Sequence, residues 1–516
     1  MLIILGGYWH EIEFFKFIFW GLSQGLFFFQ VMELSNMGPY PGQRLGIFGL
    51  SSFFPYMNVY LFSFLLVLPL IFIVPLQGKR DAKQDVVYYR PESNSEYIWG
   101  ISLGYIGGFF LMGCVSCMCS MFVHLFISDF PFDVSVYLFY LFTLILPTIV
   151  FVFGLCLFVK CVVGHHLLSL LVLFLYFGVF GFMIRDVWSG VFDFTGLTLP
   201  NAFSEVTGHP DLFPYLLHRT AYFLVGVGFI QLTGLDLGRL ANAPEKRFSR
   251  IVAVFVLMAM SLGIFVFFFL RNNEKMELRR VYTGTDCKYS SFAKGTLSSQ
   301  SIRFEQQGDR MKVKSYSVIH NRTGEMLRNV VLYLNPGLEI NTFQIDEENF
   351  AFERENQVVI AGRQVAPGDS VVVRIDYAGS VDECVCYLDI SREIIKKEKQ
   401  TMDLLCPFGK RYAFLGQDFT LLTPEVLWYP TTKPVINVRT PYAIDKDFTR
   451  FSLEVVASGN KTIISQGKKK MVNGVVTFVN EQELTGITLC IGDYETRTTT
   501  IDSIVCELYV FKRASS

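Results

Sequence analysis

The chain divides into two stretches that differ in their pattern of hydrophobic and polar positions. Up to about Leu270, long apolar runs rich in Phe, Leu and Val alternate with short charged clusters. After Arg271, charges are spread throughout and no long apolar run occurs. A helix that crosses about 30 Å of hydrocarbon at about 1.5 Å per residue needs roughly 20 apolar residues. We therefore expect a transmembrane domain at 1–270 and a soluble domain at 271–516.

The first stretch predicts a membrane α-helical bundle of about six or seven transmembrane helices. The weakest candidates are the first span, which contains Lys16, and the sixth, which begins at Arg219. The connection 185–218 is too polar to span a membrane and too aromatic to lie free in water. We expect it in the outer interface and partly helical. The expected spans are 14–31, 57–76, 98–126, 136–159, 167–184, 219–235 and 251–270.

The distribution of Lys and Arg predicts that the second half of the chain lies outside the cytoplasm. Cytoplasmic loops carry an excess of both residue types. The connections after the second and sixth spans hold several residues of both types and the one after the fourth holds Lys160, whereas the loops at 35–49 and 128–133 hold only Arg44. Basic residues between Arg271 and Arg280 directly follow the seventh span and oppose this orientation, but long domains translocate largely regardless of charge.

A polar loop at 78–100 separates the second and third spans. Its charges, among them Arg90 and Glu96, would each cost several kcal/mol inside the bilayer, so we expect the loop in the cytoplasm. Ser93 or Asn94 is placed to cap a helix that leads into the third span. The residues alone leave two interpretations open: a solvated turn, or a docking surface for a cytoplasmic partner.

The third span carries a stripe of small residues, because Gly100, Gly104 and Gly108 recur every fourth residue. Such a stripe lets transmembrane helices approach closely, and we expect it to be a helix-packing face. His124, near the outer end of the same span, is more typical of a core or interfacial histidine than of a proton carrier.

The second half predicts an all-β domain with two packed sheets. Runs rich in Val, Ile and Tyr, such as MKVKSYSVI and SVVVRIDYA, alternate with turn signals such as NPG and APGD between 310 and 380. Similar runs resume after an irregular section near 392–403. An even number of cysteines in a domain outside the cytoplasm predicts at least one disulfide, with the pairing open, among Cys287, Cys384, Cys386, Cys406, Cys490 and Cys506.

The sequence contains no motif for catalysis, or for a metal or cofactor bound by this chain alone. It has no GxxxxGK[ST] phosphate-binding loop and no HExxH, and the second half has a single histidine, His320. Cys384 and Cys386 are too few for a zinc site. The net charge of −1 indicates no class of partner, and no Arg- or Lys-rich stripe points to nucleic acid.

The stretch QDVVYYRPESNSEYIWGISLG, residues 84–104, resembles the coupling segment of type-two ABC exporter permeases that are fused to an aminopeptidase. The likeness is strong over this stretch and elsewhere rests on layout, and Ile101 stands where that family has a lysine. It implies a loop that touches an ATPase subunit and includes Asp85, Arg90, Pro91, Ser93, Glu96 and Tyr97.

Three segments of the second half resemble the N-terminal β-sandwich of aminopeptidase N-type zinc peptidases. They are LLTPEVLWYPT (421–431), FTRFSLEVVASGNKTIISQGKKK (448–470) and LTGITLCIGDYE (484–495). In that family a catalytic domain follows this sandwich. The zinc motif and the GxMEN motif are both missing from this sequence, so the resemblance implies the fold and does not carry over peptidase activity.

Together the resemblances predict the permease subunit of an ABC exporter in the bacterial inner membrane, with a periplasmic domain that handles substrate or a partner. A separate P-loop ATPase would bind ATP and Mg, and this chain would not be an enzyme. The other expected partners are a second or homologous permease, the lipid bilayer and a periplasmic peptidase-like subunit. Two alternatives stay open: an anchored accessory subunit of a split aminopeptidase-like complex, and an envelope scaffold that does not transport.

Overall fold

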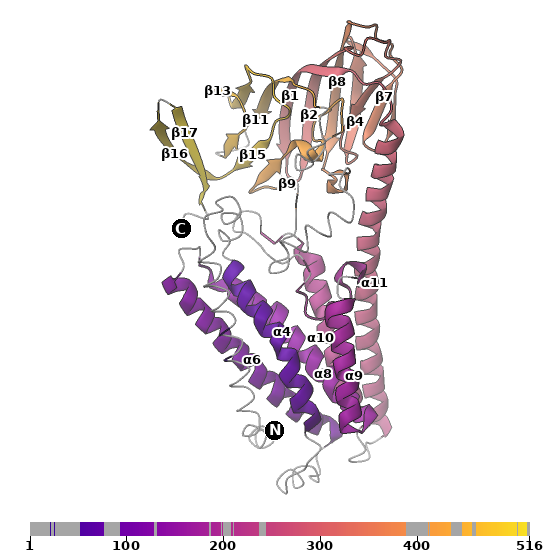
Figure 1. The fold of residues 1–516 in the computed structure, drawn as a ribbon, viewed down its shortest axis with the longest axis vertical. Coiled ribbons are helices and arrows are strands. Elements are labelled where there is room, and N and C mark those ends of the chain that lie inside the picture. Colours follow the sequence, from indigo (N-terminus) through magenta and orange to yellow (C-terminus); the bar gives the residue numbers. More distant parts are fainter. Residues whose placement is uncertain are drawn as a thin grey trace. The chain divides into compact units, whose positions relative to one another are not determined.

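The chain folds into two compact units, which Figure 1 shows for the computed structural model. The first comprises Met1–Asn273 with Lys399–Gly409, and the second Glu274–Glu398 with Lys410–Ser516. The structure describes residues 21, 25, 52–76, 93–127, 132–184, 187–197, 199, 208–209, 211–236, 244–386, 388, 411, 413–434, 446–456, 461–502 and 504–512.

The first unit is helical, and its helices lie side by side in Figure 1. Two π-helices, η1 and η2, and one 3-10 turn, η3, interrupt the α-helices. The elements are α4 (Phe53–Leu76), α6 (Asn94–Ile127), α7 (Val134–Tyr140), η1 (Leu141–Ile145), α8 (Leu146–Val163), α9 (His166–Gly178), η2 (Val179–Met183), η3 (Val187–Gly190), α10 (Leu212–Asp236) and α11 (Pro244–Tyr289).

Four helices of the described part are long and apolar enough to cross a membrane: Phe54–Phe72, Asn94–Phe126, Val134–Val163 and Arg247–Tyr289. They coincide with the second, third, fourth and seventh expected spans. The fifth expected span falls on a shorter apolar helix and the sixth on α10. The first, at 14–31, lies almost wholly outside the described residues. Membrane crossing and the number of spans stay predictions.

The run from α7 through α8 is one helical rod with a π-helical turn in its middle. Pro147 lies at the start of α8 and has no N–H to donate. The carbonyl of Thr143, four residues earlier, therefore cannot form its regular α-helical bond. The N–H of Leu146 bonds to the carbonyl of Leu141, five residues back, which is the π-helical pattern.

Helix α8 lies at the centre of the first unit, and every side chain from Pro147 to Leu157 is buried. It meets α10 where two glycines allow the backbones to touch. A Cβ added to Gly154 would lie 2.4 Å from the carbonyl oxygen of Gly226, and one added to Gly226 would lie 2.6 Å from that of Val150. Small residues at such contacts let helices pack closely without a hydrophobic driving force between them.

The second unit is rich in β-structure, and its described strands form four sheets where the sequence predicted two. The largest has eight strands in the order β13-β14-β11-β1-β2-β8-β4-β5, and the others have four, three and two strands. Burial alternates along β2 and β8, as expected of strands with one face on a core. The strands are β1 (Thr296–Gln307), β2 (Arg310–His320), β3 (Val330–Tyr333), β4 (Leu338–Ile345), β5 (Glu348–Asn349), β6 (Phe352–Glu355), β7 (Val358–Ala361), β8 (Ser370–Gly379), β9 (Ala413–Leu415), β10 (Thr420–Leu422), β11 (Arg450–Val456), β12 (Thr462–Ile464), β13 (Lys468–Val472), β14 (Val475–Val479), β15 (Leu489–Gly492), β16 (Tyr494–Ile501) and β17 (Ile504–Phe511).

The last turns of α11 belong to the core of the second unit. Tyr282 and Tyr289 are 5% and 6% exposed and lie in the same apolar cluster as the strands. The Tyr282 hydroxyl donates to Asp382 at 2.7 Å, and its carbonyl accepts from Gln357 Nε2 at 2.7 Å. The Tyr289 hydroxyl donates to Glu355 at 2.6 Å. The helix end is therefore an integral part of the β-rich unit.

The described cysteines of the second unit are free thiols. The expected disulfide is therefore wrong among the described residues, and Cys406 lies outside them. Cys386 is buried and Cys384 is half-buried, whereas Cys287 and Cys506 are exposed. Burial raises the pKa of the Cys384 thiol to about 12, with the Asp382 carboxylate adding to the shift. The Cys384 and Cys386 thiols act as small core side chains at neutral pH.

Candidate functional site

The described part of the predicted coupling loop is the capped start of α6. The backbone N–H and the hydroxyl of Ser93 donate to the Glu96 carboxylate at 2.9 and 2.8 Å, and the Glu96 N–H donates to the Ser93 hydroxyl at 3.3 Å. This reciprocal pair is a capping box. Of the two predicted caps, Ser93 and Asn94, the structure shows Ser93, and the Glu96 carboxylate is bound by the start of its own helix.

The other coupling residues divide between the described and undescribed parts of the chain. Tyr97 is half-buried on the first turn of α6. The remaining three, Asp85, Arg90 and Pro91, lie outside the described residues. The C-terminal end of α10 packs beside this start of α6, since a Cβ added to Gly234 would lie 3.9 Å from the Cα of Ser95. The coupling role of these residues stays a prediction.

The three glycines of the predicted packing stripe all lie within α6. Gly100 and Gly108 are buried, and Gly104 between them is half-buried. Farther along the same helix the Ser116 hydroxyl donates to Asn58 of α4 at 2.9 Å. At the far end His124 is 1% exposed, and its Nδ1 lies 3.0 Å from the Tyr137 hydroxyl. Of the two predicted settings for His124, core and interfacial, the structure shows a buried side chain in the helical core.

A second polar cluster centres on Arg219 of α10, which is 2% exposed within the helical unit. Its Nε donates to the carbonyl of Thr143 at 2.9 Å, and its Nη2 donates to the carbonyl of Leu144 at 3.2 Å and to the Thr148 hydroxyl at 2.8 Å. Its Nη1 donates to the carbonyl of Phe194 at 2.9 Å. The guanidinium thus joins the π-helical turn η1 to the chain around Phe194.

Residues 187–197, called the interior segment below, are irregular chain buried against the helices. Beside Phe194, three more of its carbonyls meet side chains. His218 Nε2 lies 3.0 Å from the carbonyl of Gly190, and the Tyr222 hydroxyl donates to that of Val191 at 2.8 Å. The Tyr56 hydroxyl donates to the carbonyl of Leu197 at 2.9 Å. Buried irregular backbone is tolerated where side chains satisfy its polar groups.

The interior segment closes on itself through Asp193, whose side chain is fully buried. The Asp193 carboxylate accepts from the N–H and the hydroxyl of Thr195 and from the N–H of Gly196. Gly196 has a φ of +72°, and a Cβ there would lie 2.8 Å from Cδ of Arg219. Only glycine fits both the turn and the guanidinium beside it.

The interior segment belongs to the connection 185–218 that was expected at the outer interface, and its place relative to a membrane stays a prediction. Its Phe194 and Leu197 are each 3% exposed, although Trp188 remains 57% exposed. Sequence reasoning treated Arg219 only as a weakness of the sixth span and did not single out Asp193 or His218. The sequence signal that could have identified this cluster is the charge of Arg219 within an apolar run, because a charged residue in a membrane helix usually marks a functional position.

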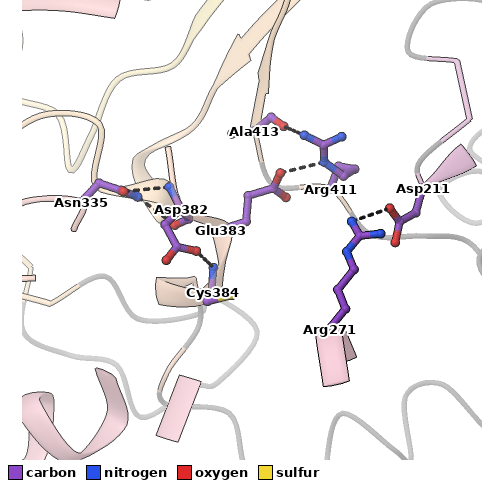
Figure 2. A network of polar contacts seen from close by, with 8 residues as sticks. All are labelled: Asp211, Arg271, Asn335, Asp382, Glu383, Cys384, Arg411 and Ala413. Atoms are coloured by element: carbon purple, nitrogen blue, oxygen red, sulfur yellow. Dashed lines mark hydrogen bonds and ion pairs between the residues drawn. The ribbon is translucent and has the colours of Figure 1, made fainter. Parts of the chain in front are cut away.

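A separate polar network in the second unit surrounds Asp382 (Figure 2). The Asp382 N–H donates to the Asn335 side chain, and the Asp382 carboxylate accepts from the N–H of Cys384, both at 2.9 Å. Arg411 Nε donates to Glu383 at 2.7 Å. These contacts order a turn. No group of three or more His, Cys, Asp or Glu side chains that could hold a metal ion occurs among the described residues.

In the first unit, Figure 2 also shows Arg271 of α11 paired with Asp211 at 3.1 Å. Both side chains are about one-third exposed. An ion pair with this much solvent access contributes little to stability, on the order of 0–1 kcal/mol. Unlike the buried Arg219, this pair can be lost without leaving buried groups unsatisfied.

No protein-family model matches the chain, and no curated protein matches it. Partial similarity links it to solved structures of an M1 zinc metallopeptidase from Deinococcus radiodurans and of a mutant of such an enzyme, from the same organism, bound to a Tyr-Ser-Ala substrate. In both cases identity is 14%, the TM-score is 0.31, and 41% of this chain and 46% of the other are covered.

A two-domain M1 zinc metallopeptidase mutant bound to L-tryptophan is also similar, with 14% identity, a TM-score of 0.30, and coverage of 41% of this chain and 47% of that one. This chain spans less than half the length of these matched chains. They belong to the enzyme class that three segments of the second half resemble in sequence. The permease resemblance stays a prediction.

Proposed function

We propose that the chain is a permease subunit of an ABC transporter of the type-two exporter class, with a separate ATPase. The observation that carries the proposal is the buried Arg219 and the irregular chain it holds among apolar helices. Charges in the interior of a membrane bundle are expensive to keep and are typical of substrate or ion pathways. Anchoring helices need neither a buried guanidinium nor irregular backbone.

The cytoplasmic partner in this proposal is a P-loop ATPase that docks on the 78–100 loop and binds ATP and Mg. The sequence of that loop resembles the coupling segment of such permeases, and its C-terminal end is the capped start of α6. A second permease, identical or homologous, completes the path across the inner membrane. The β-rich unit lies on the periplasmic side, where it handles substrate or holds a peptidase-like partner.

The test is to purify the tagged full-length chain in a mild detergent and to identify its partners by mass spectrometry. A P-loop ATPase in a fixed ratio to this chain is the expected result. A zinc peptidase subunit in its place, with no ATPase, would overturn the proposal and favour an accessory subunit of a split peptidase. Purification without either partner would favour an envelope scaffold.

The docking surface is tested by combining Arg90→Ala with Glu96→Gln. Gln keeps an oxygen that can accept from Ser93, so the start of α6 keeps its cap while both charges are lost. We expect at least a fivefold loss of copurified ATPase at an unchanged yield of the permease. The control variant is Lys461→Ala, which removes a charge from the second unit and should leave the amount of copurified ATPase unchanged. Undiminished ATPase in the double variant would exclude the loop as the docking surface.

A further inference from the structure

The interior segment and the π-helical turn η1 are joined through a single side chain. Arg219 places three of its hydrogen bonds on Thr143, Leu144 and Thr148, and one on Phe194 of the interior segment. A guanidinium is planar and carries five N–H donors in a fixed fork, so it bridges several acceptors at once. Movement of either η1 or the interior segment therefore changes the hydrogen bonds that Arg219 can make to the other.

The acceptor on the η1 side exists because of Pro147. In a regular α-helix the carbonyl of Thr143 would accept from the N–H of residue 147, and proline has none. That carbonyl is 2.9 Å from Nε of Arg219. Thr148 reinforces the site, since its hydroxyl donates to the Leu144 carbonyl at 2.7 Å and accepts from Arg219 Nη2 at 2.8 Å.

The interior segment forms hydrogen bonds within itself, among them those to Asp193, but four of its carbonyls also depend on side chains of the surrounding helices. Its carbonyls at Gly190, Val191, Phe194 and Leu197 meet side chains of α10 and α4. The bond to Phe194 is the one made by a charged donor, and charge-assisted bonds are roughly twice as strong as neutral ones. Gly196 leaves room for the Arg219 side chain, because a Cβ at this position would lie 2.8 Å from Cδ and 2.9 Å from Nη1 of Arg219.

We infer that Arg219 is a latch that holds residues 187–197 inside the helical unit and couples their release to the helical register of residues 141–145. A π-helical turn at 141–145 presents the carbonyls that hold the guanidinium in place. When residues 141–145 change to an α-helical register, the Thr143 and Leu144 carbonyls move away from the guanidinium, which loses that anchor, and the interior segment is freed. The role of this movement as a gate rests on the proposed permease function, whereas the latch itself does not.

The test measures hydrogen–deuterium exchange, by mass spectrometry, in the full-length chain in lipid nanodiscs. In Arg219→Lys, one ammonium group replaces the fork and cannot reach both η1 and Phe194. We expect exchange in 187–197 to rise at least tenfold, while α4 and the middle of α8 keep their protection. Arg247→Lys, at the exposed start of α11, is the matched control and should leave 187–197 unchanged.

Two results with Arg219→Lys would overturn the inference. Unchanged exchange in 187–197 would mean that Arg219 does not hold the segment. A similar rise throughout α4, α8 and α10 would mean that Arg219 supports the whole bundle and is not a latch. Since neither readout needs an ATPase or transport, failure of the latch is distinguishable from failure of the proposed permease function.

Pro147→Ala tests the coupling with a variant that should fold, because it restores a helical hydrogen bond. The new N–H competes for the Thr143 carbonyl. We expect slower exchange at 141–149 together with at least threefold faster exchange at 187–197. A merely structural role for this region would move both peptides in the same direction. Slower exchange at 141–149 with no change at 187–197 would refute the coupling.

Discussion

At the residue scale, Glu96 stabilises the start of its own helix, in addition to the docking role proposed for it. Its carboxylate closes the capping box with Ser93. We expect Glu96→Ala to destabilise the start of α6 by about 1 kcal/mol, the usual order for loss of a cap. The measurement is amide exchange at 93–97 in the purified chain. Glu96→Gln is the control, and equal exchange in both variants would contradict the capping role.

The thiols of the second unit should react in the order of their burial. Cys287 and Cys506 are exposed, whereas the pKa of Cys384 is raised to about 12 by burial and by the neighbouring Asp382. Because the thiolate is the reactive form, we expect maleimide to label Cys287 and Cys506 at pH 7.5 at least tenfold faster than Cys384. Peptide mass spectrometry after a short pulse measures this, and fast labelling of Cys384 would contradict it.

The raised pKa of Cys384 also sets a direction for stability against pH. An unfolded thiol titrates near its ordinary pKa of 9.0, whereas the folded one holds its proton to about pH 12. Between these values the folded state binds more protons than the unfolded state, so stability falls as pH rises. We expect Cys384→Ala to flatten the loss of stability between pH 9 and 11 in thermal unfolding. An unchanged slope would show that another group dominates.

At the scale of elements, the contact of α8 with α10 depends on two glycines. Gly226→Ala would place a Cβ 2.6 Å from the carbonyl oxygen of Val150, which is backbone and cannot rotate away. We expect it to cost about 1–3 kcal/mol, the usual range for overpacking. Gly107→Ala on α6 is the control, because nothing lies within 4 Å of its added Cβ. Thermal unfolding in detergent compares them, and equal midpoints would contradict this packing.

Helices and strands with a regular hydrophobic period could be predicted from the sequence. Segments whose conformation depends on contacts with residues distant in sequence could not. The alternation along β2 and β8 marks strands with one buried face, and the long apolar runs mark α4, α6, α8 and α11. Strand β1, TLSSQSIRFEQQ, was not predicted because most of its residues are polar. The burial of the interior segment among the helices was not predicted, because it depends on side chains that are distant in sequence, Tyr56 and Tyr222 among them.

The candidate site was predictable in part, for the same physical reason. The cap at Ser93 follows from a local Ser-x-x-Glu pattern, which needs no knowledge of the fold. The partners of Arg219 include a carbonyl freed by Pro147 and a turn around Asp193, and these meet only when α10, the helical rod of η1 and α8, and the interior segment pack together. The spacing of these residues in the sequence does not indicate that they lie close together in the fold.

At the scale of the whole molecule, the boundary between the two units falls within α11. The last turns of this helix supply Tyr282 and Tyr289 to the core of the second unit. We expect a fragment of residues 274–516 to be more stable than one of residues 290–516, which lacks both tyrosines. Removing two buried aromatic side chains should cost at least about 3 kcal/mol. Urea unfolding of the two fragments measures this, and equal midpoints would contradict it.

The central place of β1 has a consequence for the order in which the sheet can assemble during synthesis. One edge of β1 is completed early by β2, its neighbour in sequence, but the other pairs in parallel with β11, from Ser299 with Arg450 onward. That edge must wait until some 150 further residues have been made. Long-range pairing of this kind slows folding and leaves an unpaired strand open to aggregation. The charged side chains of Arg303 and Glu305 on β1 make this unpaired edge a poorer template for another chain.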